Sequence, residues 1–170
     1  RPLQPVLGDE LQGTYPDASA AMASLLLLRL ALPDGIDCRY GIGVGQMTTV
    51  PSRVGDLAEG PAWWAAREAI ELVHDKQSRA VPAARTWIVA AEGHGGVEVG
   101  YANAYLLARD QLIGRMPART RRLAYGRLLG RTQGELADDE QISQSAVSQA
   151  LASAGFSALA EGLAQRSGRS

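Results

Sequence analysis

The chain has 170 residues, of which 46% are hydrophobic and 21% are charged, and its formal net charge is −1. This length and composition predict one domain, or a medium domain plus a small one, and exclude an extensively disordered chain. No uninterrupted apolar run reaches the roughly 18 residues that a membrane-spanning helix needs. A single cysteine, Cys38, excludes an internal disulfide framework. We therefore expect a cytoplasmic protein without a membrane segment.

The charge is distributed unevenly along the chain. Residues 1–110 carry 9 basic and 13 acidic side chains, whereas residues 111–170 carry 8 basic and 5 acidic ones. A slightly acidic body followed by a basic tail indicates two roles in one chain. The chain also begins with Arg1 instead of Met, and its first residues already have the pattern of a strand. We expect an N-terminal element to be missing from it.

The first predicted elements are a hairpin and a helix. Residues 3–7 and 11–15 are the strands of the hairpin, and the Gly-Asp-Glu sequence at 8–10 forms its turn. Asp17 is a suitable N-terminal cap for a helix over residues 18–32. This helix is apolar on nearly all sides, which predicts that it is well buried.

Strands and helices then alternate. Residues 37–44 form a strand by alternation, and residues 46–59 have the composition of a strand end and a loop. A second helix opens with Pro at its first position and covers residues 61–76. A strand over residues 85–91 and a long helix over residues 98–116 complete the mixed part of the chain.

Asp9 is a candidate cation ligand because it lies at the tip of the predicted hairpin. Proteins usually hold Mg²⁺ through one or two carboxylates together with phosphate oxygens. The alternative is that Gly8 and Asp9 are ordinary turn residues, and the segment alone favours that interpretation.

Glycine occupies every second position from Gly41 to Gly45 in the predicted strand. One face of this strand therefore has no side chains, and a helix or a ligand can approach its backbone closely. The spacing differs from the dinucleotide-binding fingerprint, which lies at a strand–helix junction. Helix packing is the favoured interpretation.

Arg67 lies about two turns into the second helix, whose N-terminal amide groups are suited to an anion. Its guanidinium is therefore a candidate phosphate contact. The alternative is an alanine-rich packing helix in which Arg67 pairs with Glu71 one turn later.

The strongest local pattern covers residues 132–151. Thr132 and Glu135 form a capping-box pattern, and Ser143 is placed to cap a following helix. This pattern predicts a helix-turn-helix with a recognition helix over residues 143–152. The apolar side chains expected to pack inward are Leu136, Ile142, Val147 and Leu151. The side chains expected to face the groove of DNA are Gln144, Ser145, Ser148 and Gln149.

Six arginines lie ahead of this segment, and we name Arg119, Arg122 and Arg131 as candidate phosphate contacts. The alternative is a small packing hairpin that never meets DNA. The acidic run 138–140 favours that alternative, because carboxylates facing the duplex would repel its phosphates.

Taken together, residues 2–13, 39–45, 60–67 and 132–151 resemble the SatD family. The first three segments also resemble the class III nucleotide cyclase and GGDEF catalytic fold, in which a Gly-Asp turn holds a metal ion. The resemblance implies that Asp9 is a metal ligand with Glu10 as its neighbour, that Arg39 and Arg67 contact a nucleotide phosphate, and that Mg²⁺ binds to the full-length protein.

Two departures from these patterns bear on function. The first strand of the cyclase-like fold, which carries its other metal-binding Asp, is absent from this chain. Gln141 occupies a turn position that usually holds Gly, so it must accept a positive φ or the turn must adjust, at about 1 kcal/mol.

We therefore expect an α+β fold. A truncated nucleotide-cyclase-like domain of the ferredoxin-like or palm type, lacking its first strand, covers residues 1–114, and a small all-α helix-turn-helix domain covers residues 115–170. The expected function is a DNA-binding transcriptional regulator with a nucleotide- or metal-sensing domain, acting as a homodimer. The alternatives are a Mg²⁺-dependent nucleotidyl-transfer or cyclase-like enzyme and a catalytically inactive interaction module; for the chain as given we expect no turnover.

Overall fold

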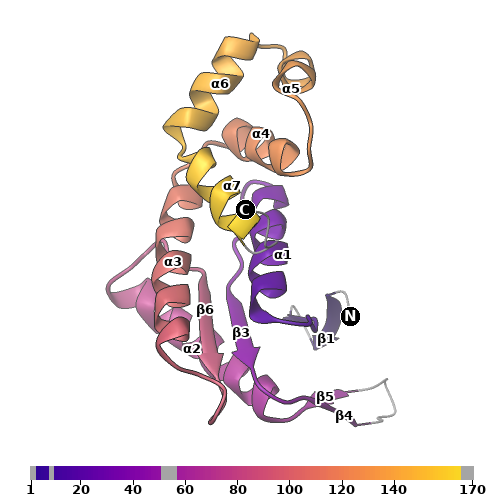
Figure 1. Ribbon diagram of the computed structural model, residues 1–170, viewed down its shortest axis with the longest axis vertical. Helices are drawn as coiled ribbons and strands as arrows, with labels where there is room; N and C mark the ends of the chain where they lie inside the picture. Colours follow the sequence, from indigo (N-terminus) through magenta and orange to yellow (C-terminus); the bar gives the residue numbers. More distant parts are fainter. Residues whose placement is uncertain (1–2, 8–9, 51–56, 166–170) are drawn as a thin grey trace.

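The computed structural model describes residues 3–7, 10–50 and 57–165, which form a mixed α+β fold (Figure 1). The molecule is elongated, with the strands toward one end and the last helices at the other. The elements are β1 (Gln4–Leu7), β2 (Glu10–Gln12), α1 (Ala18–Ala31), β3 (Tyr40–Val44), β4 (Thr48–Val50), β5 (Leu57–Glu59), α2 (Pro61–Arg79), β6 (Thr86–Ala90), α3 (Val97–Gly114), α4 (Ala118–Leu128), α5 (Gln133–Glu140), α6 (Gln144–Ser153) and α7 (Phe156–Gln165).

The described strands form three two-stranded sheets. In one of these sheets, β4 and β5 pair as antiparallel strands. The expectation of a strand end and a loop over residues 46–59 was therefore wrong. The pair is fastened by the Thr48 hydroxyl, which donates to the carbonyl of Glu59 at 3.1 Å. All three residues of β4 are β-branched, which favours an extended backbone even in so short a segment.

β3 and β6 form the central sheet and run parallel, with Tyr40 opposite Thr86 and Val44 opposite Ala90. α2 connects them and covers one face. A Cβ atom at Gly41 or Gly43 would overlap the backbone of α2. The glycine face therefore accommodates a packed helix, as the sequence analysis favoured.

The opposite face of this sheet packs on α1 and α3. Tyr40, Ile42 and Ile88 form a buried cluster there with Leu25 of α1 and Leu106 of α3. The central sheet therefore lies between α2 on one face and α1 and α3 on the other. Because β3 and β6 are direct neighbours, this βαβ unit differs from the split arrangement of a ferredoxin-like sheet, and the palm resemblance stays a prediction.

A second buried cluster joins the last four helices to the rest of the chain. Leu26 and Leu30 of α1 and Ile113 of α3 pack with residues of α4, α5, α6 and α7. The expected boundary between residues 114 and 115 thus runs through a shared core. No helix in the described ranges combines the length and the apolar character needed to cross a bilayer.

Candidate nucleic-acid interface

α5 begins with the capping box that its sequence predicts. The Thr132 hydroxyl accepts the amide of Glu135 at 3.2 Å, and the Glu135 carboxylate accepts the amide of Thr132 at 2.7 Å. These two bonds satisfy amide groups that otherwise have no partner at a helix start. The bonds from Thr132 also hold the pKa of Glu135 below its ordinary value.

The turn between α5 and α6 spans residues 141–143 and has a left-handed residue. Gln141 has φ 53° and ψ 47°, and it is the only non-glycine residue with positive φ in the described part of the chain. The next amide, that of Ile142, donates to the carbonyl of Ala137 at 3.0 Å and closes the end of α5. Ser143 then caps α6 by accepting the amide of Ala146 at 3.2 Å.

α6 has two chemically different faces. Val147 and Leu151 are buried against Leu136 and Ala137 of α5. Four short polar or amide side chains are exposed on the outer side: Gln144, Ser145, Ser148 and Gln149. α5 and α6 lie at the end of the molecule opposite the β4–β5 pair (Figure 1), so the strands do not cover this face.

Each of the three arginines named for phosphate contacts is paired with a carboxylate of α5. Arg122 binds Glu140 through Nε and Nη2 at 2.6 and 2.7 Å, and the Nε atom of Arg119 lies 3.5 Å from the same carboxylate. Arg131 pairs with Asp139 at 2.7 Å. The acidic run therefore neutralises neighbouring arginines within the protein.

These ion pairs also lower the pKa of both carboxylates. The hydrogen bond from Arg122 holds the pKa of Glu140 below its ordinary value. The hydrogen bond from Arg131 has the same effect on the pKa of Asp139. Both partners of each pair are therefore ionised at neutral pH.

A groove of about 600 Å³ separates α4 from α6. Apolar side chains of α6 form one wall, and the two arginines that bind Glu140 belong to the other. The lining residues are Pro117, Ala118, Arg119, Thr120, Arg122, Ile142, Ala146 and Ala150.

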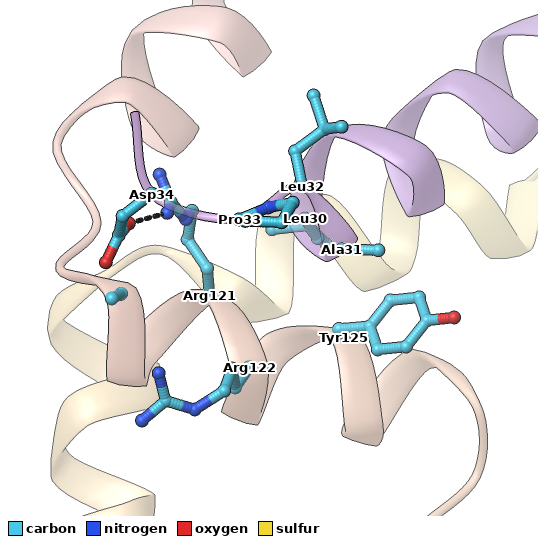
Figure 2. A pocket seen from close by; sticks show the side chains of 9 residues that line it. Leu30, Ala31, Leu32, Pro33, Asp34, Arg121, Arg122 and Tyr125 are labelled. Carbon is cyan, nitrogen blue, oxygen red and sulfur yellow. Dashed lines mark hydrogen bonds and ion pairs between the residues drawn. The ribbon is translucent and has the colours of Figure 1, made fainter. Parts of the chain in front are cut away.

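A smaller cavity of about 190 Å³ lies between the end of α1 and α4 (Figure 2). Its wall includes aliphatic residues from Leu30 to Pro33. Arg121 is turned toward Asp34, with which it forms an ion pair, while the charged end of Arg122 and the hydroxyl of Tyr125 point to opposite sides. The polar groups do not converge on one point, so the cavity lacks the arrangement of a catalytic site.

The candidate metal and nucleotide residues are only partly brought together. Asp9 lies outside the described residues. Glu10 accepts two hydrogen bonds from Arg67 at 3.2 and 3.3 Å, on the surface. Arg67 therefore pairs with Glu10 and not with Glu71, and a phosphate or a cation at this position would have to displace that contact.

Arg39 directly precedes β3 and contacts α2 at a different position from Arg67. Its Nε atom donates to the side chain of Gln77 at 2.7 Å. Gln77 is ten positions beyond Arg67 on α2, a separation of about 15 Å along the helix, so the two arginines do not form one phosphate site. Within the described ranges, no group of three or more His, Cys, Asp or Glu side chains is arranged to hold a metal ion.

A buried polar network surrounds Asp110, which is 0% exposed, and the sequence alone did not predict it. Its carboxylate accepts the amides of Arg85 and Thr86 at 2.7 Å each. Arg29 approaches the same carboxylate at 2.6 Å, and the buried Arg109 does so at 3.4 Å. This network connects α1, α3 and the start of β6.

Asn103, also on α3, makes a second set of hydrogen bonds to the backbone of β6. It accepts the amide of Ile88 at 2.8 Å and donates to the carbonyl of Ile88 at 2.9 Å. Side chains of α3 thus take the place of a neighbouring strand. Asn103 and Asp110 are seven positions apart, about two helical turns, so they lie on the same face of α3. Two polar residues at this spacing in a mostly apolar helix are the sequence pattern from which the network could have been predicted.

Comparison with known proteins identifies one part of the chain. The model of the SatD family matches residues 2–88, slightly more than half of the 170 residues. The match runs from the first strands into β6 and ends before α3. It therefore does not include residues 132–151, which the sequence resemblance had added. No curated protein and no solved structure matches the chain.

Proposed function

The chain belongs to the SatD family, and from the geometry of α5 and α6 we propose that it is a DNA-binding transcriptional regulator. The observation that carries the proposal is the two-faced α6. One side packs on α5 across a three-residue turn, and the other exposes four side chains without charge. A helix of this kind fits the major groove as the second helix of a helix-turn-helix.

The chemistry of the exposed face supports recognition of bases. A glutamine amide can bond both edge atoms of adenine, and serine hydroxyls can donate to or accept from any base. Gln144 and Gln149 supply the amides, and Ser145 and Ser148 supply the hydroxyls. Arg119, Arg122 and Arg131 are our candidates for phosphate contacts, after exchange of their present partners.

We also propose that the protein acts as a homodimer in the cytoplasm. α6 has 10 residues, enough for one half-site, and proteins of this type usually bind two half-sites through two-fold symmetry. The α+β part is proposed as a sensory body. Binding of Mg²⁺ or a nucleotide near Glu10 would open its ion pair with Arg67.

The test uses the full chain and DNA fragments selected from a random duplex pool, with binding measured by fluorescence anisotropy. Gln149→Ala is expected to weaken binding to the selected fragment by about 1–3 kcal/mol. Gln46→Ala is the matched control, because Gln46 is an exposed glutamine beside β4, at the other end of the molecule. Absence of binding to any duplex at low salt, or equal losses in both variants, would contradict the proposal.

A further inference from the structure

Glu140 is the last residue of α5, and its carboxylate is engaged on both oxygens. Oε1 lies 2.6 Å from Nε of Arg122, and Oε2 lies 2.7 Å from Nη2 of the same guanidinium. The Nε atom of Arg119 is 3.5 Å from Oε2. The Glu140 side chain is only 15% exposed, whereas the Arg122 and Arg119 side chains are 59% and 57% exposed. One largely covered anion therefore holds two accessible cations of α4.

The pair between Arg122 and Glu140 uses the same atoms that would bind a phosphate. A guanidinium binds carboxylate and phosphate oxygens through the same two-pronged arrangement of N–H groups. Arg119 and Arg122 also line the groove beside α6, together with Ile142 and Ala146. They are therefore placed next to the helix that we assign to the major groove, with their phosphate-binding atoms already occupied.

Resting on the DNA-binding function proposed above, we infer that Glu140 is a specificity-determining residue that competes internally with DNA phosphate for Arg119 and Arg122. Phosphate contacts supply essentially all of the affinity for non-specific DNA. While Glu140 holds the two arginines, that affinity is reduced. On a specific site, base contacts from α6 hold the duplex in register, and its phosphates replace the carboxylate.

A purely structural role for Glu140 predicts a different outcome. If the ion pairs only fasten α4 to α5, loss of the carboxylate lowers the free energy of unfolding and leaves the salt dependence of DNA binding unchanged. The two roles are separated by measuring affinity as a function of salt, since the slope reports how many phosphates the protein neutralises.

The experiment compares Glu140→Gln with Asp138→Asn on a random-sequence duplex. Each variant loses one negative charge from α5, but Asp138 is exposed and makes no ion pair with any described residue. Glu140→Gln is expected to raise non-specific affinity about tenfold and to steepen the slope of log K against log salt by about 1 to 2 units. Asp138→Asn is expected to raise the affinity about twofold, through long-range charge alone.

Two further variants show whether Glu140 acts through its partners. Glu140→Asp keeps the charge but shortens the side chain, so it is expected to give part of the increase. In a background of Arg119→Ala and Arg122→Ala, Glu140→Gln is expected to give no more than the twofold gain of Asp138→Asn, because only the long-range effect of the lost charge remains. Circular dichroism at 222 nm checks that each variant is folded.

The outcomes are distinguishable. Equal affinities and slopes for Glu140→Gln and Asp138→Asn would overturn the role of Glu140 and leave DNA binding intact. A tenfold gain that persists in the double-alanine background would overturn it as well. If no variant binds any duplex at low salt, the proposed function is wrong and the inference fails with it.

Discussion

Asp110 is a fully buried acidic residue of α3 that depends on neighbouring cations and amides to offset its charge. Its carboxylate is fully buried between Arg29 and Arg109 and accepts the amides that begin β6. Arg109 is itself buried and donates to the Thr86 hydroxyl at 2.7 Å and to the carbonyl of Met22 at 3.0 Å. Because water has little access to these charged groups, each of them is stabilised by its contacts with the others.

Replacement of Asp110 by Asn is expected to destabilise the protein strongly, because it leaves the buried guanidinium of Arg109 and the partly buried one of Arg29 without an anion. The expected loss is about 3–5 kcal/mol, measured by urea unfolding. Asp75→Asn is the control, since Asp75 is exposed and lies 3.8 Å from Arg79. A similar small effect of both substitutions would show that water compensates the buried cluster.

α6 is the element on which the functional proposal depends, and its residues divide sharply by environment. Val147 is 0% exposed, whereas the neighbouring Ser148 faces solvent. Adjacent helical positions point about 100° apart. The same substitution at these two positions therefore tests the inner and the outer face separately.

Val147→Asp is expected to unfold the C-terminal helices, because it places an unpaired charge in a closely packed cluster. Ser148→Asp is expected to keep the fold and to weaken DNA binding by repelling phosphate. Helical content at 222 nm and duplex affinity distinguish the two results. Retention of full helical content by Val147→Asp would contradict the packing described for α6.

α5 links stability to pH through its carboxylates. The pKa of Glu135 is lowered by Thr132, that of Asp139 by Arg131 and that of Glu140 by Arg122. A group whose pKa is lower in the folded state stabilises the fold above its unfolded pKa, about 4 for these carboxyls. That contribution is lost as the pH falls through the lower folded values.

Thermal unfolding is therefore expected to occur at progressively lower temperature as the pH is reduced from 6 to 3. Glu140→Gln has one fewer shifted carboxyl, so its melting temperature is expected to fall less over the same interval. Melting curves at 222 nm measure the difference. Parallel curves for the two proteins would contradict the assignment of the shift at Glu140.

The molecule as a whole is joined by α1. Its residues Ala21 and Leu25 belong to the cluster under the central sheet, and Leu26 and Leu30 belong to the cluster shared with the last helices. Figure 1 shows α1 between the two ends of the molecule. Because α1 contributes to both clusters, we expect the two parts on either side of residue 114 to unfold together.

Leu30→Ala is expected to cost about 2–5 kcal/mol, because Leu30 is 2% exposed and its removal leaves a cavity. The loss is expected in one cooperative transition. Tryptophan fluorescence reports the α+β part, where all three tryptophans lie, and circular dichroism reports all helices. Separate transitions, with only one displaced by the substitution, would show that the two parts unfold independently.

Local order could be predicted from the sequence. The caps at Asp17, Thr132 and Ser143 are made as predicted, because a cap and the amide it bonds lie within three residues of each other. The alternation of residues in β3 predicted that Gly41 and Gly43 share one face on which a helix packs, and α2 packs there. Gln141 has a positive φ, which is one of the two alternatives that the sequence left open for this turn position. Each of these features depends on backbone periodicity or on a hydrogen bond within one turn.

Partners distant in the chain were decided only by the tertiary structure. Glu10 binds Arg67, Glu140 binds Arg122, and Asp110 binds Arg29, and none of these pairs has a spacing that local geometry specifies. The direct pairing of β3 with β6 is of the same kind. A charged side chain can pair with any opposite charge that packing brings within a few ångströms, so the choice depends on how the helices and strands are arranged in space.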